Sequence, residues 1–311
     1  GDADGHGVDV VGGVVVDIGE VEFAAIGGDR ESTLILEVDE FNAYGVEVAT
    51  NLMIEGNNIG GSTEILRVDL NDSATEDELD FSGWQFTGWG GQDDYVEIIG
   101  SGRNETITGT RQSDAIYGGG GNDTITDVGG GSLVTLLGGT GTDVLDLSGS
   151  TSGWNIDTTN AGTNASSGPP TDLTTGRIDE FETVTASSFD DDIVGDAELS
   201  VIYGGDGNDT LINGAGAASL YGGNGNDTLE ASGSASQELL FGLSGNDTFR
   251  FTDPNGDYSP DFLFGGFGGQ DRILVQGNAD GQVFDLVSVE VSDIEEVEFA
   301  AIGGDRDITL I

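Results

Sequence analysis

The 311-residue sequence contains no cysteine, no lysine and a single histidine, His6. The absence of cysteine excludes disulfides and thiolate metal sites, and it permits an oxidising location without requiring one. Nucleophile and base pairs built on cysteine or histidine are therefore not available, and we expect no enzymatic activity. Paired carboxylates of the glycosidase kind are the catalytic alternative that composition leaves open.

Long apolar segments are also missing, since no run of eighteen apolar residues occurs. This pattern predicts no membrane insertion. The first residues, GDADGHG, lack the basic and apolar blocks of a signal peptide. If the protein is exported, we expect its signal to lie outside this chain.

Positive charge is scarce, because 58 acidic residues face only 8 basic ones and the formal charge is −50. An excess of this size repels nucleic acid and anionic membranes and opposes a compact state. Two carboxylates ~5 Å apart repel by roughly 3 kcal/mol at an effective dielectric of ~20. The composition therefore favours either an ion-binding protein or an acidic surface adapted to salt.

The sequence is rich in glycine, with 55 residues, and much of it falls in a nine-residue repeat. In this repeat an acidic residue at the sixth position is followed two residues later by an apolar side chain, as in Asp209 with Leu211 and Asp227 with Leu229. The nine-residue period, which continues where the acid is lost and resumes after small insertions, gives the apolar series Ile107, Ile116, Ile125, Leu145, Ile193, Ile202, Leu211, Leu220, Leu229, Leu240, Phe249 and Ile273. A six-residue loop followed by a three-residue strand can bury one side chain only by stacking on its neighbours.

Two nine-residue units make one coil, which predicts a solenoid of parallel strands with loops along both edges. Residues eighteen apart, such as Asp191, Asp209 and Asp227, then share one edge, while Ser200, Ala218 and Glu238 lie on the other. Glycines permit positive φ and turn backbone carbonyls into the gap between loops. Carboxylates with carbonyls form an all-oxygen site, which suits Ca²⁺ better than zinc or copper.

Four segments carry a recognisable motif: GGGGNDTIT (118–126), GGTGTDVLD (138–146), GGDGNDTLI (204–212) and GGNGNDTLE (222–230). They resemble the RTX (repeats-in-toxin, hemolysin-type) calcium-binding nonapeptide repeats, and the wider resemblance covers residues 100–147 and 187–275. The resemblance implies an all-β, right-handed parallel β-roll or β-helix solenoid, with several Ca²⁺ ions held between stacked glycine-rich loops.

In that family each ion lies between two loops one coil apart and is held by both aspartates and by loop carbonyls. Carried over to this sequence, the best pair is Gly205, Gly207 and Asp209 with Gly222, Asn224 and Asp227. The resemblance implies similar sites for Asp191 with Asp209 and for Glu105 with Asp123. The pairs Asp123 with Asp143 and Asp227 with Asp247 are spaced by twenty residues, which puts their geometry in doubt. The full set of candidate metal ligands and loop residues is Glu105, Asp114, Gly118, Gly119, Gly120, Gly121, Asp123, Gly138, Thr140, Asp143, Asp191, Gly204, Gly205, Asp206, Gly207, Asp209, Gly222, Gly223, Asn224, Gly225, Asp227, Gly242, Ser244, Asp247 and Asp271.

A longer repeat joins the two ends of the sequence, since EVEFAAIGGDR occurs at residues 20–30 and again at 296–306. We expect residues 1–35 to be an end segment copied by residues 276–311, as in one unit of a tandem array. Two related capping segments of a complete protein are the alternative. Between them we expect a β-rich solenoid without the motif (36–99), a first RTX block (100–147), an insertion with a re-entry strand (148–186) and a second RTX block (187–275).

These features predict a secreted, calcium-stabilised and non-catalytic repeat unit of an extracellular filament, a surface layer or a giant adhesin stalk. Its expected partners are calcium, tandem or self-associating copies of the same unit, and surface polysaccharide. One alternative is the calcium-binding part of a larger secreted hydrolase or polysaccharide-modifying enzyme. Another is a carbohydrate- or ice-binding adhesin module, in which Trp84, Trp89 and Trp154 could stack on sugars.

Overall fold

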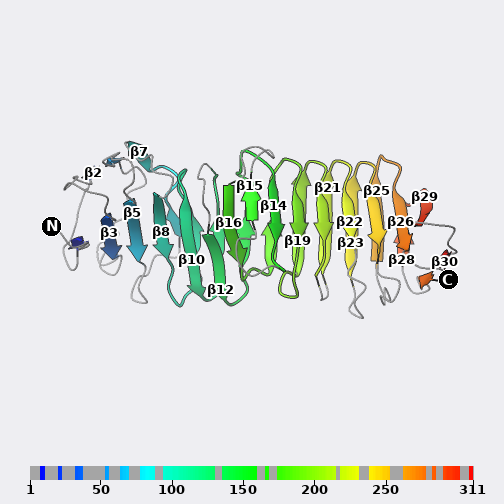
Figure 1. The fold of residues 1–311 in the computed structure, drawn as a ribbon, viewed down its shortest axis with the longest axis horizontal. Helices are drawn as coiled ribbons and strands as arrows, with labels where there is room; N and C mark the ends of the chain where they lie inside the picture. The colour runs from blue at the N-terminus through cyan, green and yellow to red at the C-terminus, as the bar shows by residue number, and fades with distance from the viewer. Residues whose placement is uncertain are drawn as a thin grey trace. The chain divides into compact units, whose positions relative to one another are not determined.

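The computed structural model describes residues 8–10, 20–22, 32–37, 53–55, 64–69, 78–87, 94–129, 135–159, 165–167, 174–214, 218–230, 238–252, 262–277, 282–284, 290–301 and 308–310. His6, Trp89 and most of the long repeat lie outside these residues. All regular elements in the described part are β-strands, which confirms the all-β prediction (Figure 1). None of the described residues forms a helix long and apolar enough to cross a membrane.

The chain divides into two compact units. Unit 1 comprises Gly1–Gly149 and Leu173–Phe181, and unit 2 comprises Ser150–Asp172 and Glu182–Ile311. Each unit is a β-solenoid, because its strands stack in parallel ladders whose successive members come from successive coils.

Unit 1 contains three ladders of parallel strands. The first runs in the order β1 (Val8–Val10), β3 (Ser32–Glu37), β5 (Glu64–Asp69), β8 (Tyr95–Ile99), β10 (Asp114–Gly120), β12 (Thr135–Thr140) and β16 (Thr174–Asp179). The second runs β6 (Glu78–Asp80), β9 (Thr106–Thr108), β11 (Thr124–Thr126) and β13 (Val144–Asp146). The third runs β2 (Glu20–Glu22), β4 (Met53–Glu55) and β7 (Gln85–Thr87).

Unit 2 is also built from ladders of parallel strands, except that β15 pairs antiparallel with β14. One ladder runs β15 (Ala165–Ser167), β14 (Trp154–Asp157), β18 (Asp192–Val194), β20 (Thr210–Ile212), β22 (Thr228–Glu230), β24 (Thr248–Phe251), β26 (Arg272–Gly277) and β29 (Glu296–Ala301). The other runs β17 (Thr183–Thr185), β19 (Val201–Asp206), β21 (Ser219–Asn224), β23 (Leu239–Ser244), β25 (Phe262–Phe267) and β28 (Glu290–Ser292). Strands β27 (Gln282–Phe284) and β30 (Ile308–Leu310) form a separate pair.

The apolar residues of the nine-residue repeat form the core. Ile202, Leu220, Leu240 and Leu263 occupy the same register on neighbouring strands, and each is at most 1% exposed. A second column faces them from Ile193, Leu211, Leu229, Phe249 and Ile273. Burying one such side chain stabilises the fold by about 1.5–3 kcal/mol relative to leaving it in water. All twelve apolar residues predicted from the repeat are buried, as expected.

The segment expected to be an insertion, residues 148–186, contains a core strand. Trp154 and Ile156 of β14 are 4% and 0% exposed, and β14 pairs in parallel with β18. The indole Nε1–H of Trp154 donates to Ser150 Oγ at 2.9 Å, which satisfies its polar atom inside the core. Trp84 is also buried, at 5% exposed. Neither indole is therefore an exposed platform for a sugar.

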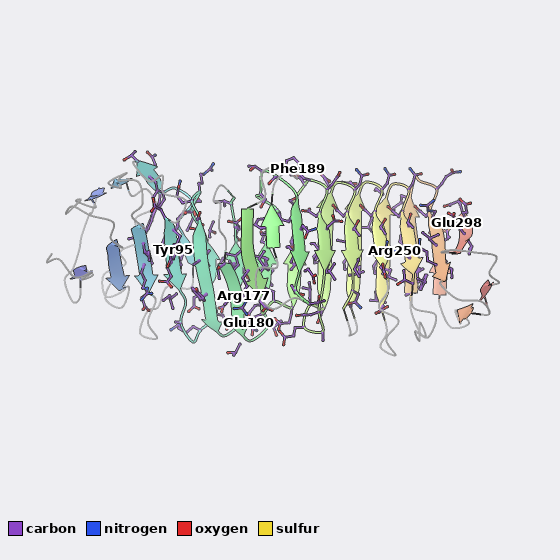
Figure 2. The ribbon with its side chains drawn as sticks, in the orientation of Figure 1. Tyr95, Arg177, Glu180, Phe189, Arg250 and Glu298 are labelled. Atoms are coloured by element: carbon purple, nitrogen blue, oxygen red, sulfur yellow. The ribbon has the colours of Figure 1, made fainter. Side chains whose placement is uncertain are left out.

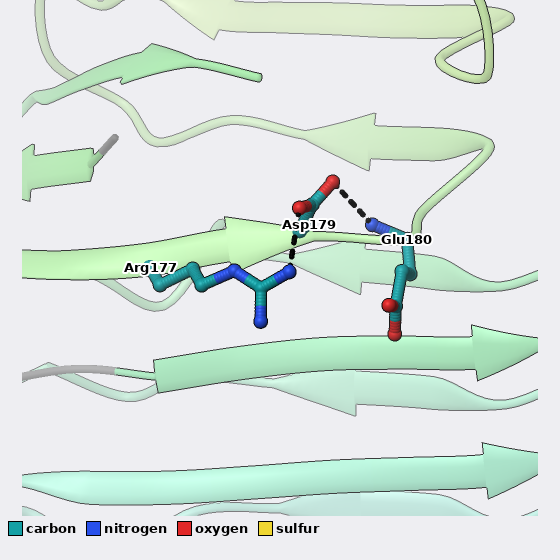
Figure 3. A network of polar contacts seen from close by, with 3 residues as sticks. All are labelled: Arg177, Asp179 and Glu180. Carbon is teal, nitrogen blue, oxygen red and sulfur yellow. Dashed lines mark hydrogen bonds and ion pairs between the residues drawn. The ribbon is translucent and has the colours of Figure 1, made fainter. Parts of the chain in front are cut away.

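Strand β16 ends at a turn without the glycine motif (Figure 3). Arg177 Nη2 donates to Asp179 Oδ2 at 2.9 Å, and the N–H of Glu180 donates to Asp179 Oδ1 at 3.0 Å. Glu180 has a φ of 65°, and its carbonyl oxygen would lie 1.9 Å from a Cβ at Gly138. The glycine-rich loops of unit 1 therefore stop at this coil.

The two copies of the long repeat pair their strands in the same register. Val8 of β1 faces Leu34 of β3, and Phe284 of β27 faces Leu310 of β30. Both members of the second pair lie 276 positions after those of the first. The sequence identity between the copies therefore extends to their backbone pairing.

Candidate metal sites

In the part of the chain that the structure describes, six glycine-rich loops each join two consecutive strands of the solenoid, and we call them the open loops. In unit 1 they are residues 118–123 and 138–143. In unit 2 they are residues 204–209, 222–227, 242–247 and 265–271. Each ends at an aspartate immediately before the next strand, so the predicted ligands Asp123, Asp143, Asp209, Asp227, Asp247 and Asp271 all stand at equivalent positions.

Glycine occupies the second position of five of these loops and the fourth position of all six. Gly205 and Gly207 have φ values of 109° and 125°, in the region that disfavours other residues. A Cβ at Gly223 would lie 1.9 Å from the carbonyl oxygen of Gly205, and one at Gly225 would lie 1.4 Å from that of Gly207. The carbonyls of one loop therefore point at the backbone of the next, as predicted.

The aspartates of successive open loops are connected through the backbone. The N–H of Asp209 donates to Asp227 Oδ1 at 2.9 Å, and the N–H of Asp227 donates to Asp247 Oδ1 at the same distance. The N–H of Asp247 donates in the same way to Asp271 Oδ1 at 2.8 Å. In unit 1 the N–H of Asp123 donates to Asp143 Oδ1 at 2.7 Å. The twenty-residue spacings therefore preserve the aspartate contacts.

The second carboxylate oxygen of these aspartates is directed into the loop. Oδ2 of Asp123, Asp209, Asp227 and Asp247 is buried and has no hydrogen-bond partner. At Gly204 and Gly222 a Cβ would come within 2.4 and 2.3 Å of the Oδ2 of the aspartate in the same loop. A buried carboxylate oxygen without a donor is costly, and a cation is the usual way to satisfy it.

Burial raises the pKa of these carboxyl groups in the metal-free chain. The pKa of Asp209 rises to about 8, chiefly by desolvation and further by the nearby carboxylates of Asp191 and Asp227. Desolvation likewise raises the pKa of Asp123 and Asp247 to about 7 and that of Asp227 to about 6. The loops hold carboxyl groups that resist ionisation unless positive charge is supplied.

The donor set of the open loops fits calcium. The described residues contain no cluster of three or more histidine, cysteine, aspartate or glutamate side chains. A site between two loops would therefore combine two carboxylates with backbone carbonyls, which are hard oxygen ligands. The carbonyl of Asn224, one of the implied ligands, already accepts the N–H of Gly207 at 2.9 Å.

Leu243 occupies the second position of the loop at 242–247, where the neighbouring loops have glycine. It has a φ of 80° and stands in register between Gly223 and Gly266. A non-glycine residue in this region carries strain of about 1–3 kcal/mol. We expect Leu243→Gly to raise the free energy of unfolding of the calcium-loaded protein by about 1 kcal/mol in urea titration.

The control for this substitution is Leu239→Gly, on the same strand and without positive φ. It should destabilise the protein, because glycine in a strand interior loses backbone entropy and side-chain packing. A loss of stability on Leu243→Gly equal to that on Leu239→Gly would refute the assignment of strain.

Sequence reasoning missed an asparagine column at the exposed tips of the loops. Asn226 Nδ2 donates to Asn208 Oδ1 at 3.0 Å, and Asn246 Nδ2 donates to Asn226 Oδ1 at 2.8 Å. The backbone N–H of Asn226 and that of Asn246 donate to the same acceptors. The recurrence of asparagine before the motif aspartate was the available signal. The column links successive loops without any cation.

The other predicted ligands stand in a different setting. Glu105 precedes β9 and Asp191 precedes β18, each on the edge that carries its unit's open loops. Asp114 begins β10 and lies on the return edge of unit 1. On the return edge of unit 2, Ala218 and Glu238 precede β21 and β23, as predicted. The Nδ2 of Asn213 donates to Glu238 Oε1 there at 2.7 Å.

Comparison with known proteins agrees with this geometry. A family model of the RTX calcium-binding nonapeptide repeat matches residues 99–126, 185–219 and 219–235, in four copies. No curated protein matches the chain. The open loops at 138–143, 242–247 and 265–271 lie outside the matched residues, yet the structure stacks each of them on its neighbouring loops. The chain therefore carries RTX calcium-binding nonapeptide repeats, folded as a β-solenoid that matches the RTX β-roll.

Proposed function

We propose that this chain is a non-catalytic structural unit of an extracellular assembly, a filament, a surface layer or an adhesin stalk, whose solenoid is completed by calcium. The observation that carries the proposal is the row of buried aspartates with partnerless Oδ2 atoms in the open loops. RTX repeats are typical of secreted proteins, which agrees with an extracellular location.

The chain's own residues supply the ligands and their spacing. Asp209, Asp227 and Asp247 would hold the ions through Oδ2, while Oδ1 of Asp227 and Asp247 keeps each loop bonded to the preceding one. Gly205 and Gly207 direct their carbonyls into the same gap. When bound, calcium supplies the positive charge that lets these carboxyl groups ionise without repulsion.

The tandem arrangement is supported by the long repeat. Its two copies share both sequence and strand register, with Val8 facing Leu34 and Phe284 facing Leu310. A repeat that includes an entire solenoid is suited to a long array, in which each unit presents the same interface to the next.

The assembly is tested by electron microscopy of the native source material, labelled with an antibody against this chain. We expect label along a fibre or lattice with a regular spacing, and dispersal of that label when calcium is chelated. Labelled particles of a single size that carry hydrolase activity would favour the alternative, a calcium-binding part of a larger secreted enzyme.

The calcium sites are tested by Asp227→Asn. Asp227 is shared by two neighbouring loops, so we expect fewer ions per chain and at least a ~10-fold higher calcium concentration for half-saturation in calorimetric titration. Asp192→Asn is the matched control, because it removes the same charge from an exposed position of β18 outside the open loops. Equal effects of the two substitutions would show that surface charge alone attracts the ion.

A further inference from the structure

Among the described residues, three loops of the repeat type carry a hydroxyl side chain at their second position in place of glycine. They are residues 100–105, 109–114 and 186–191, and we call them the closed loops. In each, the second residue donates both its N–H and its hydroxyl to the acidic residue four positions later. The pairs are Ser101 with Glu105, Thr110 with Asp114, and Ser187 with Asp191.

The geometry of these pairs is tight. In the loop at 109–114, Thr110 N–H donates to Asp114 Oδ2 at 2.8 Å and Thr110 Oγ1 donates to Oδ1 at 2.7 Å. In the loop at 186–191, the N–H and hydroxyl of Ser187 reach Asp191 Oδ2 at 3.0 and 2.8 Å. Oδ1 of Asp191 accepts the N–H of Trp154 at 2.5 Å. Both oxygens of each carboxylate therefore already have donors.

The same hydroxyl also accepts a hydrogen bond across the loop. Its donor is the backbone N–H at the fourth position, from Arg103 at 3.2 Å, Gln112 at 3.0 Å and Phe189 at 3.1 Å. None of these three residues has positive φ, and Phe189 projects at the edge of the fold, 44% exposed (Figure 2). The hydroxyl therefore donates to the carboxylate of the sixth residue and accepts from the backbone N–H of the fourth residue of the same loop.

The open loops have the opposite arrangement. Their fourth position is glycine with positive φ, as in Gly121, Gly207 and Gly225. Their second position has no hydroxyl to offer, and Oδ2 of Asp123, Asp209 and Asp227 has no hydrogen-bond partner. The acidic residue at the end of the loop thus has a hydroxyl donor in the closed loops and an unpartnered oxygen in these open loops.

Two of the closed loops stand at the beginning of a row of open ones. The N–H of Glu105 donates to Asp123 Oδ1 at 2.8 Å, and the N–H of Asp191 donates to Asp209 Oδ1 at 2.8 Å. On its other side, Asp191 accepts from Trp154 of β14, a strand without the motif. The closed loop at 186–191 therefore connects the aspartate row of unit 2 to a strand that has no calcium motif.

We infer that the closed loops take no calcium, that Ser101, Thr110 and Ser187 replace the cation, and that calcium is confined to the gaps between open loops. This inference rests on the proposed calcium-dependent function. It replaces the family-based expectation that ions lie between Glu105 and Asp123 and between Asp191 and Asp209. The hydroxyl residue at the second position decides which repeats hold metal.

The first test counts the ions bound by the intact chain with native mass spectrometry. Asp191→Asn is expected to leave the number of calcium ions unchanged, while Asp227→Asn lowers it by at least one. A loss on Asp191→Asn as large as that on Asp227→Asn would overturn the inference. A wild-type chain that binds no calcium would instead overturn the proposed function.

The second test addresses the hydroxyl and does not depend on counting ions. Thr110 is fully buried, so Thr110→Val keeps its shape and Thr110→Ser keeps its hydroxyl. In folded protein, we expect Thr110→Val to speed hydrogen exchange of the Gln112 amide by at least ~10-fold, and Thr110→Ser to leave it slow. Unchanged exchange in Thr110→Val would refute the bridging role, as would equally fast exchange in both variants.

Discussion

Removing calcium at neutral pH is expected to convert the folded chain into an expanded acidic coil. The reason is electrostatic, because the chain has a formal charge of −50 and buries a row of aspartates in each unit. Without positive charge those carboxylates must remain protonated against their ordinary pKa or repel one another inside the fold. Folding and calcium binding are then one equilibrium.

This result is measured by circular dichroism and small-angle scattering before and after addition of a calcium chelator at pH 7.5. We expect the β-strand signal to disappear, the radius of gyration to increase, and both to recover with excess calcium. Magnesium is the control, since its small octahedral shell is poorly served by these loops. Sodium chloride at equal ionic strength tests whether simple screening is enough. A chelated chain with an unchanged spectrum would refute the coupling.

Acidification is expected to restore the fold of the calcium-free chain. In the folded metal-free state the pKa is about 8 for Asp209 and about 7 for Asp123 and Asp247, while an unfolded aspartate titrates near ~3.9. Between these values the folded state binds more protons than the unfolded state. The stability of the calcium-free fold is therefore fully present below about pH 4 and is lost as pH rises toward 8.

The measurement is circular dichroism of the chelated chain from pH 8 down to pH 5, which stays above the isoelectric point of about 4.1. We expect β-structure to return as pH falls below about 8, the pKa of Asp209, because the buried aspartates take up protons in the folded state. Calcium affinity should change in the opposite direction, because protons compete for the same carboxylates. A chelated chain equally unfolded at pH 5 and pH 8 would contradict this linkage.

The sequence was sufficient to predict the repeating part of the core. The period of nine residues is also the length of half a coil, so each predicted apolar residue, such as Leu211 or Ile202, arrives at an inward position. The same argument placed Asp209 and Asp227 in neighbouring loops. A residue type that recurs at one position of the repeat can be placed from the sequence, because every copy of that position has the same structural environment.

Features that occur once were not predictable in this way. Trp154 and Ile156 complete a coil without any repeat motif, and only their pairing with β18 shows it. The hydrogen bond from the Ser187 hydroxyl to Asp191 was also not predictable. The sequence ASSFDD differs from the motif as any degenerate copy of it would. The strained φ of Leu243 follows from its stacking between two glycines, which depends on register rather than on local preference.

The backbone connection between successive aspartates makes each row of loops a one-dimensional chain. In unit 2 this series of hydrogen bonds joins Asp191, Asp209, Asp227, Asp247 and Asp271. It ends where the N–H of Asp271 donates to Glu295 Oε2. In such a chain each member senses only its two neighbours, so order spreads by nearest-neighbour coupling. The number of consecutive hydrogen bonds in the row then sets how steeply calcium binding depends on calcium concentration. One broken link divides a steep, switch-like response into two shallower ones.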